Sequence, residues 1–110
     1  MNKPISFSNL QEITLVDQVV VISMTQAWQQ EDTLPIGKAV LGCLPKSKIV
    51  EINEGADRLD IRIDYKNTLF VMRFDITSQS CWIEIEQGVS SNEIMEVYKT
   101  LQNGMHFKSE

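Results

Sequence analysis

The chain has 110 residues, 43% of them hydrophobic and 23% charged, with 5 glycines and 3 prolines. These proportions are typical of one globular domain and exclude a disordered or repetitive chain. The formal net charge of −5 disfavours binding to nucleic acid or to an anionic membrane, because the average surface repels phosphate.

The lengths of the apolar segments indicate the cellular compartment of the protein. Residues 1–13 lack the continuous apolar stretch of a secretory signal. The longest apolar runs, such as residues 19–22, fall far short of the roughly 20 residues that a membrane helix needs. We therefore expect a cytoplasmic protein that has no membrane partner.

The reactive residue types form no recognisable catalytic or metal-binding motif. Cys43 and Cys81 each have apolar neighbours, which favours buried, reduced thiols over a disulfide or a reactive thiol. His106 is the only histidine and lies near the end of the chain. A phosphate-binding glycine loop, a nucleophile elbow and a metal-spaced Cys/His set are all missing. The sequence thus predicts no catalytic residue, no metal and no cofactor.

The first part of the chain predicts a lead-in followed by a strand. Residues 1–10 show no clear period and are expected to be irregular. The β-branched residues that follow favour a strand, and Asp17-Gln18 is either a hairpin turn or a bulge within it. We predict one strand over residues 18–24.

A helix is predicted next. Asp32 or Thr33 can cap it, and Pro35 fits its first turn, where no backbone hydrogen bond is lost. Residues 26–30 are expected to form a separate helical turn anchored by Trp28.

Four short alternating runs then predict an antiparallel meander, since the connections between them are too short for crossovers. The runs cover residues 48–53, 58–65, 68–75 and 81–86. A tight turn at Lys66-Asn67 would set Asp60 opposite Arg73 and place every apolar residue of that hairpin on one face. Arg58 would likewise lie opposite Asp75.

The last element is a helix over residues 91–102. Ser90 and Glu93 match a capping box, and Asn103-Gly104 is a typical helix stop. Residues 104–110 are therefore expected to be a frayed tail.

Together these elements predict an α+β fold, a two-layer sandwich in which one face of an antiparallel β-meander is covered by two helices, in the approximate order β-α-β-β-β-β-α. Val50, Ile52, Cys81 and Ile83 are expected to face the helices.

The opposite sheet face is predicted to bind a protein partner or a second copy of the chain. In the expected register Leu69, Val71 and Trp82 project there, and a tryptophan beside arginines is typical of interface hot spots. The candidate partner-binding residues are Trp82, Val71, Leu69, Arg62, Arg73 and Glu84. Alternatively, the N-terminal residues Ile5, Phe7 and Leu10 fold over this patch.

Other charged groups are interpreted as solvated surface. The carboxylate pairs Asp60/Asp64 and Glu84/Glu86 share strand faces with arginines that can neutralise them. The segment 38–48 carries three lysines and no acid, which alone does not make a nucleic-acid site in an acidic protein.

The leading hypothesis is a small, non-enzymatic interaction module: an adaptor, a regulator or a chaperone-like protein. In size and charge the chain is similar to small acidic α+β secretion chaperones, a similarity of class that assigns no residues. The alternative is a small-ligand-binding protein or modest enzyme with a pocket between sheet and helix, near Met24, Trp28, Cys43 and Tyr98.

Overall fold

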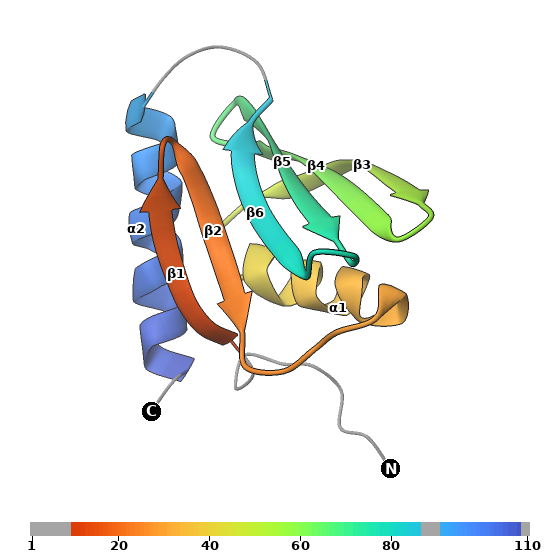
Figure 1. Ribbon diagram of the computed structural model, residues 1–110. Coiled ribbons are helices and arrows are strands. Elements are labelled where there is room, and N and C mark those ends of the chain that lie inside the picture. The colour runs from red at the N-terminus through yellow and green to blue at the C-terminus, as the bar shows by residue number, and fades with distance from the viewer. Residues whose placement is uncertain (1–9, 87–90, 109–110) are drawn as a thin grey trace.

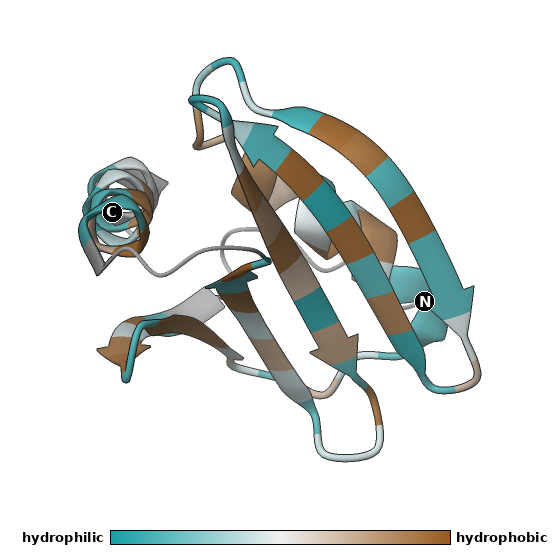
Figure 2. Ribbon diagram, turned by 90° about the horizontal axis from the view of Figure 1, so that it is seen from above, coloured by the Kyte–Doolittle hydropathy of each residue, from teal (hydrophilic) through white to brown (hydrophobic). Residues whose placement is uncertain are grey.

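The computed structural model describes residues 10–86 and 91–108, which form one antiparallel sheet and two helices (Figure 1). In chain order the elements are β1 (Leu10–Val16), β2 (Val19–Met24), α1 (Gln30–Leu41), β3 (Lys48–Gly55), β4 (Arg58–Tyr65), β5 (Thr68–Asp75), β6 (Ser80–Ile85) and α2 (Ser91–Lys108). The strand order across the sheet is β1-β2-β6-β5-β4-β3. Both helices lie on one side of the twisted sheet, so the predicted α+β class is confirmed (Figure 2).

The start of the chain differs from the prediction, because it forms a hairpin rather than a single strand. β1 and β2 pair through the turn Asp17-Gln18, whose residues have φ angles of 48° and 64°. Two positive φ angles are the mark of a type I′ turn, whose backbone twist matches that of the strands. This turn contains no glycine, which is why its sequence did not decide between hairpin and bulge. Residues 1–9 of the expected lead-in lie outside the described residues.

Helix α1 begins earlier than predicted. The N–H of Gln29 donates to Asp32 Oδ2 at 2.8 Å, so Asp32 caps the helix from its first turn. Pro35 consequently lies in the second turn. Residues 27–29 are not helical, and Trp28 is held instead by Gln79, whose side chain accepts from the Trp28 N–H and donates to its carbonyl, both at 3.0 Å.

Close packing fixes α1 against the sheet. Trp28 is 2% exposed and meets Phe74 edge to face, with the ring centroids 5.6 Å apart. Gly37 faces Ile61, and a Cβ atom at position 37 would lie only 2.5 Å from Ile61 Cδ1. Alanine would force Ile61 to shift, so glycine permits the close approach of helix and strand at this point.

The register of the β4–β5 hairpin is confirmed. Lys66 and Asn67 form its turn with positive φ angles, and Asp60 lies opposite Arg73. Arg58 lies opposite Asp75 as predicted, although its guanidinium approaches Asp60, at 3.9 Å.

Strand β3 corrects the expectation that Val50 and Ile52 are covered by the helices. Val50 is 55% exposed and Ile52 is 42% exposed. The register shifts between Ile49 and Glu51, which leaves Val50 in a bulge. Ile52 lies opposite the buried Ile61, so it is on the helix side of the sheet. It stays exposed because α1 packs on β4, one strand in from this edge.

Helix α2 is longer than predicted and passes through the expected stop at Gly104. A Cβ at position 104 would lie 3.0 Å from Cys43 Cβ and 3.1 Å from its Sγ. Gly104 thus permits close approach to Cys43 rather than ending the helix, and α2 continues through residues 104–108 of the expected tail. Ser90 of the expected capping box lies outside the described residues. In the part of the chain that the structure describes, neither helix has the length and apolarity to cross a membrane.

Candidate functional site

The sheet face turned away from both helices carries the candidate site (Figure 2). One row of outward-facing residues crosses five strands from Thr14 on β1 through Val21, Trp82 and Arg73 to Asp60 on β4. After Thr14 the row is apolar at Val21 and Trp82, and it is charged at Arg73 and Asp60. Trp82 stands at the boundary between these two halves.

The charged half is a network that we call the ion lattice: Glu51, Asp60, Arg62, Arg73, Glu84 and Glu86. Arg73 donates to Glu84 at 2.7 Å and to Asp60 at 3.1 Å. Arg62 donates to Glu51 and, through Nε, to Glu86, each at 2.7 Å. Both arginines therefore link three strands of the sheet. Asp60 Oδ1 is buried without a hydrogen-bond partner among the described residues.

The ion lattice explains why one predicted contact residue is hidden. Arg62 lies on β4 and Glu86 follows β6, so their ion pair passes across β5. Val71 lies on β5 directly opposite Arg62 and is only 3% exposed. Val71 thus packs beneath the charged side chains and offers little surface to a partner.

The protonation of the lattice follows from these contacts. Partial burial raises the pKa of Glu84, but hydrogen bonds from Trp82 and Arg73 outweigh it and hold this pKa below its usual range. The pKa of Arg73 is raised, chiefly by its hydrogen bond to Glu84. Glu84 therefore remains a carboxylate at neutral pH and fixes the groups around it.

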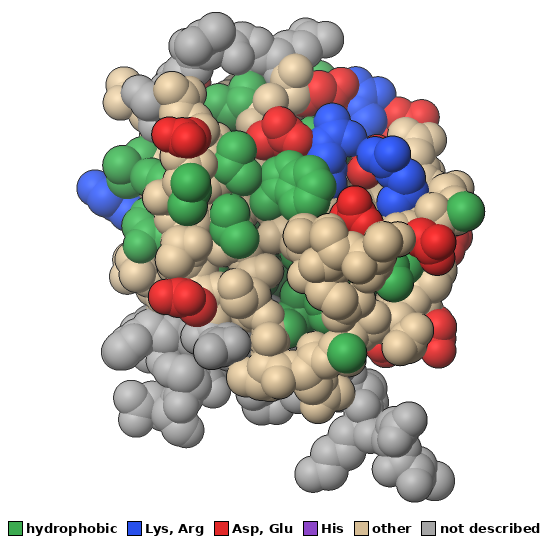
Figure 3. All heavy atoms as spheres, viewed as in Figure 1, with side chains coloured by type: hydrophobic (Ala, Val, Ile, Leu, Met, Phe, Trp, Pro, Cys, Tyr) green, Lys and Arg blue, Asp and Glu red, His purple; other side chains and the backbone are tan. Residues whose placement is uncertain are grey.

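The apolar half forms a shallow hollow of about 520 Å³ at the β1–β2–β6 end. We call its outward-facing apolar residues the apolar patch: Val16, Val19, Val21 and Trp82. Val16 is 52% exposed, and the Trp82 indole N–H donates to Glu84 Oε2 at 2.9 Å. Figure 3 shows hydrophobic side chains gathered over β1, β2 and β6, beside a cluster of arginines and acids.

The structure separates the six predicted partner-binding residues into different roles. Trp82 and Leu69 are partly exposed, and Val71 is buried. The other three residues form ion pairs in the ion lattice: Arg73 with Glu84 and Asp60, and Arg62 with Glu51 and Glu86. Sequence reasoning missed the three valines of the apolar patch, because their exposure depends on the unpredicted β1–β2 hairpin. The N-terminal residues proposed to cover the patch are outside the described ranges, apart from the backbone of Leu10 in β1.

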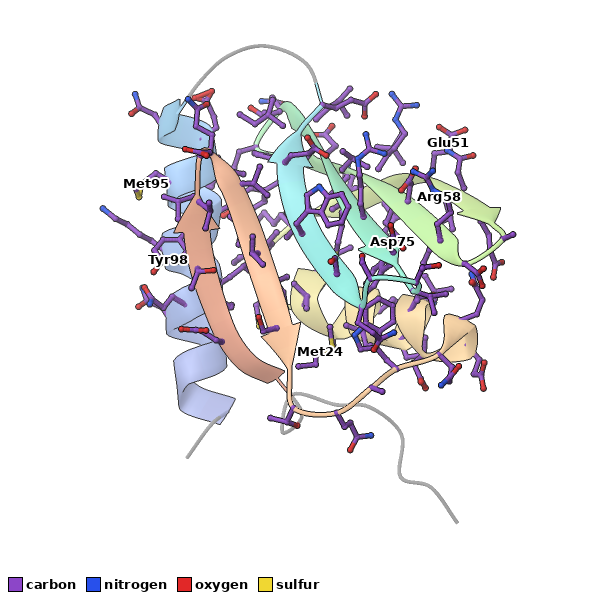
Figure 4. The ribbon with its side chains drawn as sticks, in the orientation of Figure 1. Met24, Glu51, Arg58, Asp75, Met95 and Tyr98 are labelled. Atoms are coloured by element: carbon purple, nitrogen blue, oxygen red, sulfur yellow. The ribbon has the colours of Figure 1, made fainter. Side chains whose placement is uncertain are left out.

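The alternative pocket between sheet and helix gains no support from the packing. Trp28 is part of the core, and a methyl group at position 37 would clash with Ile61 unless that side chain moved. Met24 instead lines a surface hollow beside Trp28 and Gln79. Figure 4 places Met24 at the end of β2, well apart from Tyr98 on α2.

Other reactive groups are not gathered into a site. Cys81 is 1% exposed, and burial raises the pKa of its thiol. Cys43 is half-buried, and neither cysteine forms a disulfide. Among residues 10–86 and 91–108, no group of three His, Cys, Asp or Glu side chains is placed to hold a metal ion. The side chain of His106 lies outside the described part.

Comparison with known proteins gives a family but no activity. Neither the curated proteins nor the solved structures contain a match to this chain. One family model matches residues 10–103, from the first residue of β1 almost to the end of α2, and its description is a protein of unknown function, DUF3630. The matched region covers the whole sheet, helix α1 and most of α2, so the chain belongs to the DUF3630 family.

Proposed function

We propose that this protein is a non-enzymatic interaction module of the cytoplasm, which binds a protein partner or a second copy of itself across the outer face of the sheet. The observation that carries the proposal is the apolar patch, which lines a hollow on the face opposite the helices and is left open by residues 10–86 and 91–108. Hot spots of protein interfaces are rich in tryptophan for its large contact area.

Trp82 is arranged as an anchor. Its indole N–H is held by Glu84, which is itself held by Arg73. A side chain that is already fixed loses little conformational entropy on binding, so its contact area contributes more fully to affinity. Because the indole N–H already donates to Glu84, the partner need not supply a hydrogen-bond acceptor for it.

The ion lattice and the apolar patch have different roles in this proposal. Arg62 and Arg73 already bind carboxylates within the chain, so they frame the hollow rather than reach for an acidic partner. The partner should therefore present an apolar side chain to the patch, with polar groups around it for the rim. The unbridged cysteines fit a reducing compartment.

The test compares three proteins in a pull-down from source-cell lysate and in sedimentation: wild type, Trp82→Glu and Met95→Ala. Met95 is 38% exposed on α2, on the far side of the β1 edge from Trp82, so it is a matched surface control (Figure 4). We expect Trp82→Glu to abolish capture of the partner, or self-association, and Met95→Ala to retain it. Circular dichroism and urea unfolding confirm that each variant is folded. Equal binding by all three would refute a site at Trp82.

A further inference from the structure

A further hollow, of about 590 Å³, shares no lining residue with the hollow at the β1–β2–β6 end of the sheet. It lies where the α1–β3 connection, the β4–β5 turn and α2 meet. Its polar lining residues are Lys46, Lys48, Asp64, Lys66, Asn67 and Thr100. Hollows of this size are typical of small-molecule sites.

The lining of this hollow is basic although the protein is acidic. Three lysines face one aspartate there, whereas the whole chain carries a net charge of −5. Lys66 is paired with Glu96 and lies 5.4 Å from the centre of the Tyr65 ring. Within the described ranges, Lys46 and Lys48 enter no ion pair. Two ammonium groups are therefore available to an anion.

The α1–β3 connection holds Lys46 at this hollow. Lys46 has φ 65° and follows Pro45 in a turn that the Ser47 N–H closes by donating to the Leu44 carbonyl at 3.1 Å. A positive φ at the residue after proline is typical of a type II turn. The turn therefore fixes the backbone of Lys46 at the hollow that Lys48 and the β4–β5 turn also line.

We propose that this hollow binds a small phosphate monoester, with Lys46 and Lys48 contacting the phosphate. A phosphate monoester carries a charge of about −1.5 to −2 at neutral pH and is attracted by these two ammonium groups, which outnumber the one carboxylate of the lining, Asp64 opposite Lys48. Asn67 and Thr100 add neutral hydrogen-bond donors to the lining. The hollow of about 590 Å³ is larger than a phosphate group, so it has room for an organic portion. A sugar phosphate and a nucleoside monophosphate share this chemistry.

The experiment titrates inorganic phosphate, ribose 5-phosphate and adenosine 5′-monophosphate into ¹⁵N-labelled protein and follows the amide resonances. We expect saturable shifts at residues 46–48, 67 and 100, with at least one organic phosphate binding more tightly than inorganic phosphate. The tighter of the two organic ligands identifies the organic portion as sugar or nucleoside. No saturable shift at these residues, or equal affinity for inorganic phosphate, would overturn the assignment.

Matched variants separate the hollow from a general charge effect. Lys46→Gln with Lys48→Gln should weaken binding by roughly tenfold or more, because two charge-assisted contacts are lost. Lys38→Gln with Lys99→Gln removes the same charge from exposed lysines that do not line the hollow, and should change affinity by less than roughly threefold. Equal weakening by the two pairs would show non-specific attraction and overturn the site.

A single variant separates binding from folding at Lys46. Lys46→Gly should raise the urea midpoint, because glycine adopts the left-handed conformation without strain, and should at the same time weaken binding. A lysine that serves only the turn would give the same gain in stability and leave binding unchanged. Unchanged binding would therefore contradict the assignment of Lys46 to the ligand.

Discussion

The contact between α1 and the sheet at Gly37 allows a quantitative prediction for Gly37→Ala. The new Cβ would lie 2.5 Å from Ile61 Cδ1, whereas carbon atoms in favourable contact are about 3.5–4.0 Å apart. Overpacking a core typically costs about 1–3 kcal/mol. Ile61 is 0% exposed and has little room to move, so we take the upper part of that range. Alanine in a helix interior returns about 0.5–1 kcal/mol, which leaves a net loss of about 1–2 kcal/mol.

The assay is urea unfolding of a double-mutant cycle with Ile61→Val, which removes the Cδ1 atom that the new methyl would meet. Alone, Ile61→Val should cost about 0.5–1.5 kcal/mol. In that background Gly37→Ala should stabilise by about 0.5–1 kcal/mol, because only the gain in helix propensity remains. The coupling energy between the two positions should therefore be about 2–3 kcal/mol. The m-value should stay constant throughout, as expected when only stability changes.

Gly42→Ala is the control for this cycle. Gly42 has φ −62°, and a Cβ there would meet only the carbonyl oxygens of Ala39 and Lys38, at 3.4 Å. We expect Gly42→Ala to be neutral or to stabilise by up to about 1 kcal/mol. If Gly37→Ala lowers stability equally with isoleucine and valine at position 61, the loss does not arise from this contact and the reasoning is refuted.

Three further substitutions test separate features of the fold. Gln18→Gly should stabilise the protein by about 1 kcal/mol in urea unfolding, because it relieves a left-handed φ of 64°, and a loss of stability would contradict the type I′ turn. Gly104→Ala should destabilise by about 1 kcal/mol, since its Cβ would press on Cys43 at 3.0 Å; a gain, as helix propensity alone predicts, would show that α2 does not approach that residue. Glu84→Gln should cost about 0.5–1 kcal/mol at pH 7 through the weakened contact with Arg73. The native pKa of Glu84 is depressed, so this cost should be present above the ordinary value of 4.5 and vanish as the pH falls through the lower native pKa; a cost that persists at low pH would contradict the ion pair.

The candidate site was only partly predictable because it combines local and long-range features. Trp82, Arg73 and Glu84 were identified from the alternation of β5 and β6, which fixes the face of each residue. The valines at positions 16, 19 and 21 join Trp82 only because β2 pairs with β6, which sets Val21 opposite Trp82 from a distant part of the chain. The basic hollow likewise depends on tertiary structure, because it brings Lys46 and Lys48 to the β4–β5 turn.

The elements whose geometry is local could be derived from the residue pattern alone. The strict alternation around the Lys66-Asn67 turn allowed one register of the β4–β5 hairpin, since a slip of one residue would have exposed Phe70 and Phe74. The amphipathic pattern determined that two helices cover one face of the sheet.

Which surfaces these elements leave open depends on long-range packing. Ile52 has the pattern of a core residue, yet it is 42% exposed because α1 rests on the neighbouring strand. Gly104 has the sequence of a helix stop, yet it continues α2 because Cys43 lies against it. In both cases the outcome depends on how closely a distant segment approaches, and burial is a property of that approach rather than of the residue's own neighbours in the chain.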